Sequence, residues 1–354
     1  MKTQNIYRNI YRNIYCIIYC LFSIFFILPQ AVFAANIDKI IVFGDSLSDN
    51  GNIYHLTTLA NQVIPLIPII PKNPPYFNGR FSNGPVWIDN LALTMNVPML
   101  NYAYGGAWVE PFTDSLQLIP FGLGIQVSQY LASSVTDFNK KNHLYVIWGG
   151  ANDYIRGRSD AEYATTNTVN HIKSQMDWLI FAGATKFLIL TLPDFSFVPQ
   201  IIAQGPEFSA AVGHLSALHN QKLTQMIQNE MKAHPEVTFI LNDISISFYD
   251  IIKHPEKYHL TNVVNACYDG SYLFQSTKLD NQNELSAAKQ ANIDITANDA
   301  LHLAYRNALL AEHGELGCEN PDEYLYWDAL HPSRVIHQLI TTISLELLHN
   351  HGLS

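Results

Sequence analysis

A serine near the start of the chain and an Asp-His pair near its end have the residue types that nucleophilic ester hydrolysis requires. Ser46 ends a Gly-Asp-Ser triplet directly after a short apolar run, and Asp328 stands three residues before His331. A hydroxyl nucleophile needs a base to take its proton and a carboxylate to hold that base. Asp and His at this spacing can face one site from a single loop. We therefore predict a catalytic triad of Ser46, His331 and Asp328.

Each of these signals has a simpler interpretation when it stands alone. Gly-Asp-Ser is a common triplet, and Ser46 could cap the N-terminus of a helix. A single histidine among the 14 of this chain is usually structural or exposed. The combination favours catalysis because Asp328 accompanies His331, and because Pro332 favours a rigid start of the helix that follows.

The segments around these residues predict strands that alternate with helices. Apolar runs typical of buried strands occupy residues 39–43, 144–148, 186–192 and 237–241. Helical spacing of apolar residues is found at 163–181, 208–232 and 335–348. Strands that alternate with helices pair in parallel, so we predict a three-layer α/β/α fold with a mostly parallel central sheet. Ligand sites of such folds lie at the carboxyl ends of the strands, where Ser46 is expected.

Two segments interrupt this alternation. Residues 63–85 are rich in Pro, Asn and Gly, which predicts a long surface loop that shapes a binding cleft. Residues 268–317 are rich in Asn and Ala and lie between two cysteines. We interpret them as an insertion, so residues 35–354 are expected to form a single domain.

The first 34 residues have the pattern of a secretory signal peptide. Lys2, Arg8 and Arg12 precede an apolar run from Ile14 to Leu28, and small residues follow where a signal peptidase would cut. The alternative is an uncleaved membrane anchor, but a spanning helix needs about 20 apolar residues. We expect residues 1–34 to be removed. The mature protein is then periplasmic or extracellular, and we favour the extracellular location.

The cysteines support this location. Removal of residues 1–34 leaves only Cys267 and Cys318 of the four cysteines. An even number of cysteines in an oxidising compartment predicts one disulfide. Two buried free thiols remain the alternative.

Composition argues against several other classes of partner. The chain has 20 Lys and Arg residues against 30 Asp and Glu residues, a net charge of −10, so a basic surface for nucleic acid is not expected. No phosphate-binding Gly-Lys-Ser/Thr loop occurs. We expect no metal or other cofactor. The histidines are scattered and lack the close pairing of a zinc site; His254, His259, His302 and His313 are examples.

Four blocks of this sequence resemble, in order, the blocks of the GDSL lipase/esterase family, also called SGNH hydrolases. The similarity covers residues 38–350. It implies a flavodoxin-like α/β/α fold and an ester hydrolase activity without a cofactor. The matching residues are Ser46 on the nucleophile of the first block, Gly106 on the glycine of the second, Asn152 on the asparagine of the third, and Asp328 with His331 on the last.

The resemblance also implies an oxyanion hole. Its donors would be the backbone N–H groups of Ser46 and Gly106 and the side-chain amide of Asn152. Glycine allows close approach because it has no side chain. Taken alone, Gly106 would indicate a tight turn and Asn152 a loop cap. Asp49 and Asp153 lie in the same blocks and are expected only to hydrogen-bond their loops.

Residues 74–87 resemble the first-block extension of exported bacterial GDSL phospholipases A, lysophospholipases A and glycerophospholipid:cholesterol acyltransferases. This resemblance implies a lipid ester substrate and transient contact with a membrane surface. The aromatic residues of this stretch fit an acyl-chain pocket, or else they cover the sheet. In the acyltransferase branch a protease cuts a disulfide loop comparable to Cys267–Cys318 and releases activity, which implies an activating protease as a partner.

Three questions about function stay open at this point. The sequence does not distinguish water from an alcohol as the acyl acceptor. A carbohydrate O-acetylesterase would share the same catalytic residues but have a small polar acyl pocket. A non-catalytic secreted binding protein should have lost at least one catalytic residue, whereas this chain retains them all.

Overall fold

The computed structural model describes residues 37–353 apart from residues 66, 112–120, 156, 159 and 269–316. The expected signal peptide, residues 1–34, lies outside the described residues. So does the insertion, except for its first and last positions, Tyr268 and Gly317.

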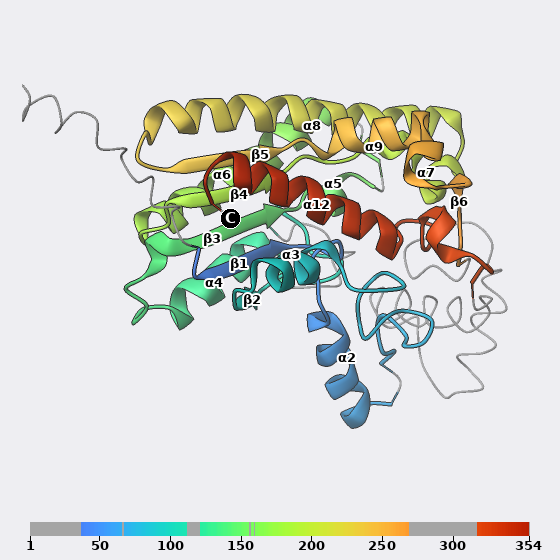
Figure 1. Ribbon diagram of the computed structural model, residues 1–354, viewed down its shortest axis with the longest axis horizontal. Coiled ribbons are helices and arrows are strands. Elements are labelled where there is room, and N and C mark those ends of the chain that lie inside the picture. Colours follow the sequence, from blue (N-terminus) through green and yellow to red (C-terminus); the bar gives the residue numbers. More distant parts are fainter. Residues whose placement is uncertain are drawn as a thin grey trace, which may run out of the picture. The chain divides into compact units, whose positions relative to one another are not determined.

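Five parallel strands form the central sheet, in the order β2-β1-β3-β4-β5 (Figure 1). The strands are β1 (Lys39–Gly44), β2 (Met99–Asn101), β3 (His143–Trp148), β4 (Lys186–Leu190) and β5 (Thr238–Asn242). The four predicted strands are confirmed, with ends that differ by at most two residues, and so is the α/β fold. The three-residue strand β2 was not predicted, because it is too short to form an apolar run.

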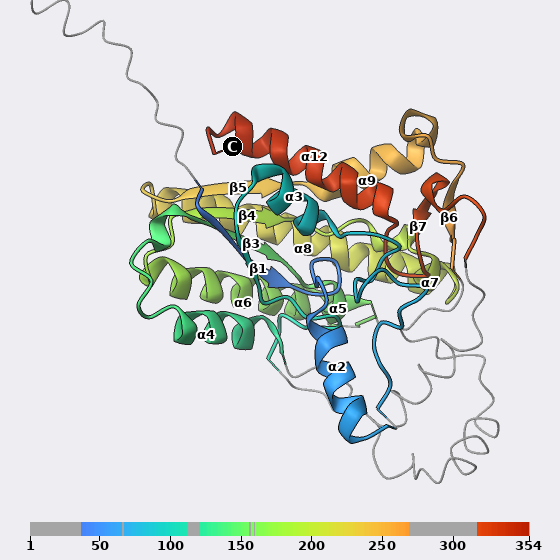
Figure 2. The ribbon, with the colours of Figure 1, turned by 60° about the horizontal axis from the view of Figure 1, so that its bottom comes forward.

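Helices cover both faces of this sheet. They are α2 (Asn52–Val63), α3 (Trp87–Met95), α4 (Leu123–Ser133), α5 (Ala151–Tyr154), α6 (Ala161–Phe181), α7 (Pro199–Ile202), α8 (Pro206–Ala233), α9 (Ile244–Lys253) and α12 (Arg334–Asn350). Figure 2 shows α3, α9 and α12 over one face and α4 and α6 over the other. The three predicted helices correspond to α6, α8 and α12. None of the helices in the described ranges has the length and apolar character that crossing a bilayer requires.

Strand β1 illustrates how the three layers are held together. Alternate side chains of a strand point to opposite faces of its sheet. Ile40 and Val42 accordingly belong to the apolar core that includes Trp87 of α3, whereas Ile41 and Phe43 belong to the core on the side of α4 and α6. The central strands are apolar because both of their faces are buried.

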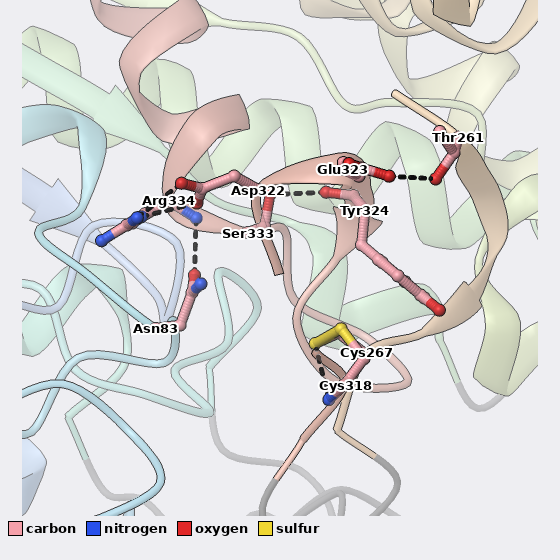
Figure 3. Close-up of a disulfide and its surroundings, with 9 residues drawn as sticks. All are labelled: Asn83, Thr261, Cys267, Cys318, Asp322, Glu323, Tyr324, Ser333 and Arg334. Carbon is pink, nitrogen blue, oxygen red and sulfur yellow. Dashed lines mark hydrogen bonds and ion pairs between the residues drawn. A yellow bond between two sulfur atoms is a disulfide. The ribbon is translucent and has the colours of Figure 1, made fainter. Parts of the chain in front are cut away.

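A small second sheet leads into the last helix. Its strands β6 (Asn262–Ala266) and β7 (Tyr324–Tyr326) are parallel. A disulfide between Cys267 and Cys318, with 4.9 Å between the Cα atoms, joins the end of β6 to the segment before β7 (Figure 3). Because β7 runs directly into Asp328, the disulfide and the two strands support the loop that carries Asp328 and His331.

The segment predicted as a surface loop, residues 63–85, is only partly on the surface. Helix α2 ends at Val63, and no helix or strand is described between it and α3. Tyr76, Phe81 and Ser82 are nevertheless buried, with exposures of 1%, 3% and 0%. The segment is a loop, as predicted, but part of it packs inward instead of lying on the surface.

Candidate active site

The loop after β1 and the loop before α12 bring Ser46, His331 and Asp328 into one chain of hydrogen bonds. His331 Nε2 lies 2.8 Å from Ser46 Oγ, and His331 Nδ1 lies 2.8 Å from Asp328 Oδ2. All three side chains are buried. A carboxylate can only accept, so Nδ1 donates to Asp328 and Nε2 is left to accept the proton of Ser46. This is the geometry of a Ser-His-Asp triad.

Asp328 is held by several donors besides the histidine ring. The backbone N–H groups of Leu330 and His331 donate to its Oδ1 at 2.8 and 2.6 Å, and the hydroxyl of Tyr76 donates to its Oδ2 at 2.6 Å. Burial by itself raises the pKa of Asp328, but the charge of His331 and the hydrogen bonds from His331 and Tyr76 outweigh burial and lower it. Asp328 therefore stays ionised and can stabilise a protonated His331.

Ser46 does not cap a helix. The α2 helix begins after Gly51, and the carboxylate of Asp49 accepts the N–H groups of Gly51, Asn52 and Ile53 at its start. Ser46 instead sits in the turn between β1 and that helix, with its hydroxyl directed at His331.

The glycine before this turn is required by packing. A Cβ atom at Gly44 would lie 2.3 Å from the backbone oxygen of Trp148 in the neighbouring strand β3. Only glycine lets the two strands approach this closely where they lead into the segments that carry Ser46 and Asn152.

Gly106 comes from the loop after β2, and Asn152 comes from the short helix α5 that follows β3. Gly106 has a φ of 78°, a left-handed conformation that glycine adopts at little cost. Asn152 donates one amide hydrogen from Nδ2 to Ala107 O at 2.9 Å, which leaves the second hydrogen of that amide available. Among the residues that the structure describes, none accepts the backbone N–H of Ser46 or Gly106. These donors have the chemistry to bind an oxyanion.

Two buried carboxylates hold these loops, as the sequence predicted for Asp49 and Asp153. Asp49 accepts the N–H of Gly105 at 2.7 Å, and Asp153 accepts the N–H groups of Val109 and Glu110 at 3.0 and 2.8 Å. Burial raises the pKa of Asp49 to about 6 and that of Asp153 to about 7, against the opposing effect of these hydrogen bonds. The prediction that they act in loop hydrogen bonding is confirmed.

A narrow pocket lies beside Ser46, Asn152 and His331. Its free volume is about 30 Å³, room for roughly two water molecules, so a long acyl chain would have to displace side chains. The wall is mainly apolar and aromatic, with Leu47, Trp148, Ile155, Phe195, Val198, Phe248 and Leu330 among its residues.

Comparison with known proteins identifies the family. The sequence model described as GDSL-like Lipase/Acylhydrolase matches residues 40–342. The chain belongs to the GDSL-like lipase/acylhydrolase family. Members of this family act on lipid esters, and the chain is a carboxylic ester hydrolase.

Relatives of this GDSL hydrolase carry several names. It is 30% identical to the phosphatidylcholine-sterol acyltransferase of Aeromonas hydrophila, over 86% of this chain and 88% of that protein. It is 26% identical to the thermolabile hemolysin of Vibrio parahaemolyticus, over 89% of this chain and 64% of the hemolysin. It is 25% identical to a GDSL esterase/lipase of Arabidopsis thaliana, over 86% and 80% of the two chains.

The aromatic stretch 74–87 supports the triad and the core of this GDSL hydrolase. Tyr76 contacts Asp328, and the ring of Phe81 packs 4.9 Å from the ring of His331, centroid to centroid. Trp87 is fully buried and packs against Trp148, with 5.8 Å between the ring centroids. None of these three aromatic residues lines the narrow pocket. They pack against the triad and the core and do not form an acyl pocket there.

Tyr76 is the site residue that sequence reasoning missed. It lies 252 positions from Asp328 and packs in a small cluster with Tyr268, Trp327 and Cys267. The sequence signal was only its place within an aromatic stretch; nothing in the spacing assigns it to the aspartate.

Tyr76→Phe is expected to lower kcat about tenfold with little change in KM. Hydrogen bonds to charged groups contribute about 1.5–3 kcal/mol, and each 1.36 kcal/mol of barrier changes a rate tenfold. The pH–rate profile should also shift along the pH axis. Loss of the Tyr76 donor changes how strongly Asp328 stabilises the protonated form of His331. Steady-state kinetics from pH 5 to 9 on a soluble ester test this, with Tyr54→Phe as a control outside the triad. An unchanged profile would show that Tyr76 only packs.

Among the described residues, one group of side chains outside this site has the spacing of a cation-binding group. Asp177, Glu230 and His234 offer ligand atoms within 4.8 Å of one another. The ammonium group of Lys173 already lies 2.9 Å from a carboxylate oxygen of Asp177 and 2.9 Å from one of Glu230. Lys173 thus already takes the place that a cation would occupy between these two carboxylates.

Proposed function

We propose that this GDSL hydrolase cleaves acyl esters of lipids, with Ser46 as nucleophile, His331 as base and Asp328 as the group that orients and stabilises His331. The observation that carries the proposal is the buried hydrogen-bond chain from Ser46 through His331 to Asp328. No other buried serine among the described residues has this pair of partners.

The reaction proceeds in two halves. His331 Nε2 takes the proton of Ser46 as Oγ attacks the ester carbonyl, and the N–H groups of Ser46, Gly106 and Asn152 stabilise the oxyanion. His331 then donates that proton to the leaving alcohol, which leaves an acyl group on Ser46. Water, or an alcohol in acyl transfer, gives up a proton to His331 as it attacks this acyl-enzyme, and the carboxylic acid or new ester departs while Ser46 regains its proton.

A lipid substrate is supported by two observations. The pocket beside Ser46 is narrow, but its wall is mainly apolar, which suits the hydrocarbon part of an acyl group better than a hydroxylated sugar. The relative from Aeromonas hydrophila is named for an activity on phosphatidylcholine and sterol. We propose a phospholipase A or lysophospholipase A type of activity, with acyl transfer as a second use of the same acyl-enzyme.

The substrate proposal predicts that long-chain lysophosphatidylcholine is hydrolysed with a higher kcat/KM than acetylated xylan. Fatty acid release and acetate release report the two activities, and p-nitrophenyl esters of increasing chain length report the acyl preference. The Ser46→Ala protein gives the background rate. Strong activity on acetylated xylan with none on lysophosphatidylcholine would instead assign the enzyme to the carbohydrate esterases.

We further propose that the protein is exported after removal of residues 1–34 and that residues 35–354 form one hydrolase domain. The positive and apolar pattern of the first 34 residues supports export, and so does the disulfide, because such bonds persist in oxidising compartments. Intact-mass analysis of the secreted protein locates the cleavage site.

We also propose that cleavage within the disulfide-closed segment 268–317 changes activity. Support comes from its ends: Cys267 and Tyr268 pack with Trp327, the neighbour of Asp328, and with Tyr76. Limited proteolysis is expected to leave two fragments joined until the disulfide is reduced, with ester hydrolysis altered after nicking. Unaltered activity of the nicked protein would mean that the segment is only structural.

A further inference from the structure

Helix α2 projects away from the sheet on the side where the catalytic loops lie, as both ribbon views show (Figure 1, Figure 2). Its free end carries large apolar side chains in solvent. Leu56, Leu59, Val63 and Ile64 have exposures of 39%, 48%, 81% and 49%. We call these four residues the α2 surface. A group of exposed apolar side chains on a protruding element is typical of an interaction site.

The segment that carries the α2 surface has no charged side chains of its own. No Asp, Glu, Lys or Arg occurs between Asp49 and Lys72, and no acidic residue occurs between Asp49 and Asp89. The chain as a whole has a net charge of −10. In this acidic protein, the segment that carries the α2 surface is thus free of negative charge. Such a segment complements a lipid surface, whose interior is apolar and whose phosphates are negative.

The backbone of the segment is also suited to an apolar medium. Ile64 N–H donates to Ala60 O, and Ile67 N–H donates to Ile64 O. Ile70 N–H donates to the hydroxyl of Thr57, and Asn61 donates to Pro65 O and Ile67 O. Prolines at 65, 68 and 71 have no N–H to satisfy. Polar backbone groups must be paired internally where water is excluded.

Hydrogen bonds tie the start of α2 to the loops around the candidate site. Asp49 caps the start of α2 and also accepts the N–H of Gly105, next to Gly106. Asn52 in the first turn donates to Asn101 O at the end of β2 and to Ala103 O in the loop that follows. The helix has 12 residues and is therefore about 18 Å long. Contact at its free end would hold the catalytic loops at a set distance from a lipid surface.

We infer that the α2 surface docks this enzyme onto the surface of phospholipid aggregates. Leu56, Leu59, Val63 and Ile64 enter the boundary between head groups and acyl chains, and the catalytic loops then receive lipid from that surface. The inference rests on the proposed lipid substrate but concerns binding, not chemistry, so the two are tested separately.

Binding is measured with the Ser46→Ala protein, which cannot consume the lipid. It is mixed with vesicles of phosphatidylcholine and phosphatidylglycerol and sedimented. A double variant, Leu59→Asp with Val63→Asp, is expected to lower the vesicle partition coefficient at least tenfold. The matched control places the same charges at exposed apolar residues elsewhere, Leu93→Asp with Val135→Asp, whose exposures are 79% and 72%. The control should bind like the parent.

Activity is measured with Ser46 intact. The α2 double variant is expected to hydrolyse a soluble short-chain ester at the parental rate but to lose at least tenfold on micellar lysophosphatidylcholine. Equal vesicle binding by the double variant and its parent would overturn the inference. A loss of vesicle binding in the control variant as large as that in the α2 double variant would also overturn it. A change from dimer to monomer without loss of vesicle binding would assign the α2 surface to self-association instead.

The outcomes keep the two proposals apart. If the parent hydrolyses lipid but does not bind vesicles, the docking inference fails and the proposed function stands. If it binds vesicles through the α2 surface but hydrolyses no lipid ester, the proposed function fails and docking stands.

Discussion

Ser46→Ala is expected to lower kcat for ester hydrolysis by about 10⁴- to 10⁶-fold, because loss of the nucleophile in a triad removes nearly all of the catalysis that its members provide together. The melting temperature should change little, since the hydroxyl contacts only His331 among the described residues. Burst and steady-state kinetics on a p-nitrophenyl ester measure the effect.

Ser48→Ala is the matched control for this variant. Ser48 is also buried and lies two positions away, but its hydroxyl accepts the indole N–H of Trp87 and does not contact His331. The Ser48→Ala variant should be less stable than the parent, but its kcat should stay within a few-fold of the parental value. If a folded Ser46→Ala protein turned over substrate at the parental rate, the assignment of Ser46 as the nucleophile would be wrong.

The other triad residues should follow in a defined order. His331→Ala is expected to be as damaging as Ser46→Ala, and a double variant should add little, because the residues act as a unit. Asp328→Asn should cost about 10⁴-fold, since the imidazole remains but is held in the wrong tautomer.

Asn152→Ala is expected to lower kcat by about 10²- to 10³-fold with little change in KM, the largest effect expected outside the triad. Its amide would bind the oxyanion, which exists only as the reaction proceeds, so its loss affects the transition state more than substrate binding. Asn152→Asp keeps the shape of the side chain but cannot donate, and should be at least as damaging.

A stability measurement separates this role from loop support. Asn152 also holds Ala107 O, so some loss of melting temperature is expected in both variants. Asn152→Ala with an unchanged kcat would mean that this contact to Ala107 is its whole function.

Much of this site follows from local sequence. A strand that ends in Ser46 and an Asp-His pair before the last helix are short-range patterns, and parallel strands place their carboxyl ends at one edge of the sheet. Gly106 and Asn152 were found only through their family blocks, because a lone glycine or asparagine has no distinctive spacing.

The sequence by itself determined the α/β fold and the residue types of the candidate site, and it predicted the disulfide between Cys267 and Cys318. The tertiary structure decided which residues support them. Tyr76 reaches Asp328 across 252 positions, and Asp49 joins the start of α2 to the turn before Gly106. These contacts depend on how separate loops pack at the edge of the sheet. Periodicity reports only the face that a residue presents within its own element, so no local pattern could have predicted them.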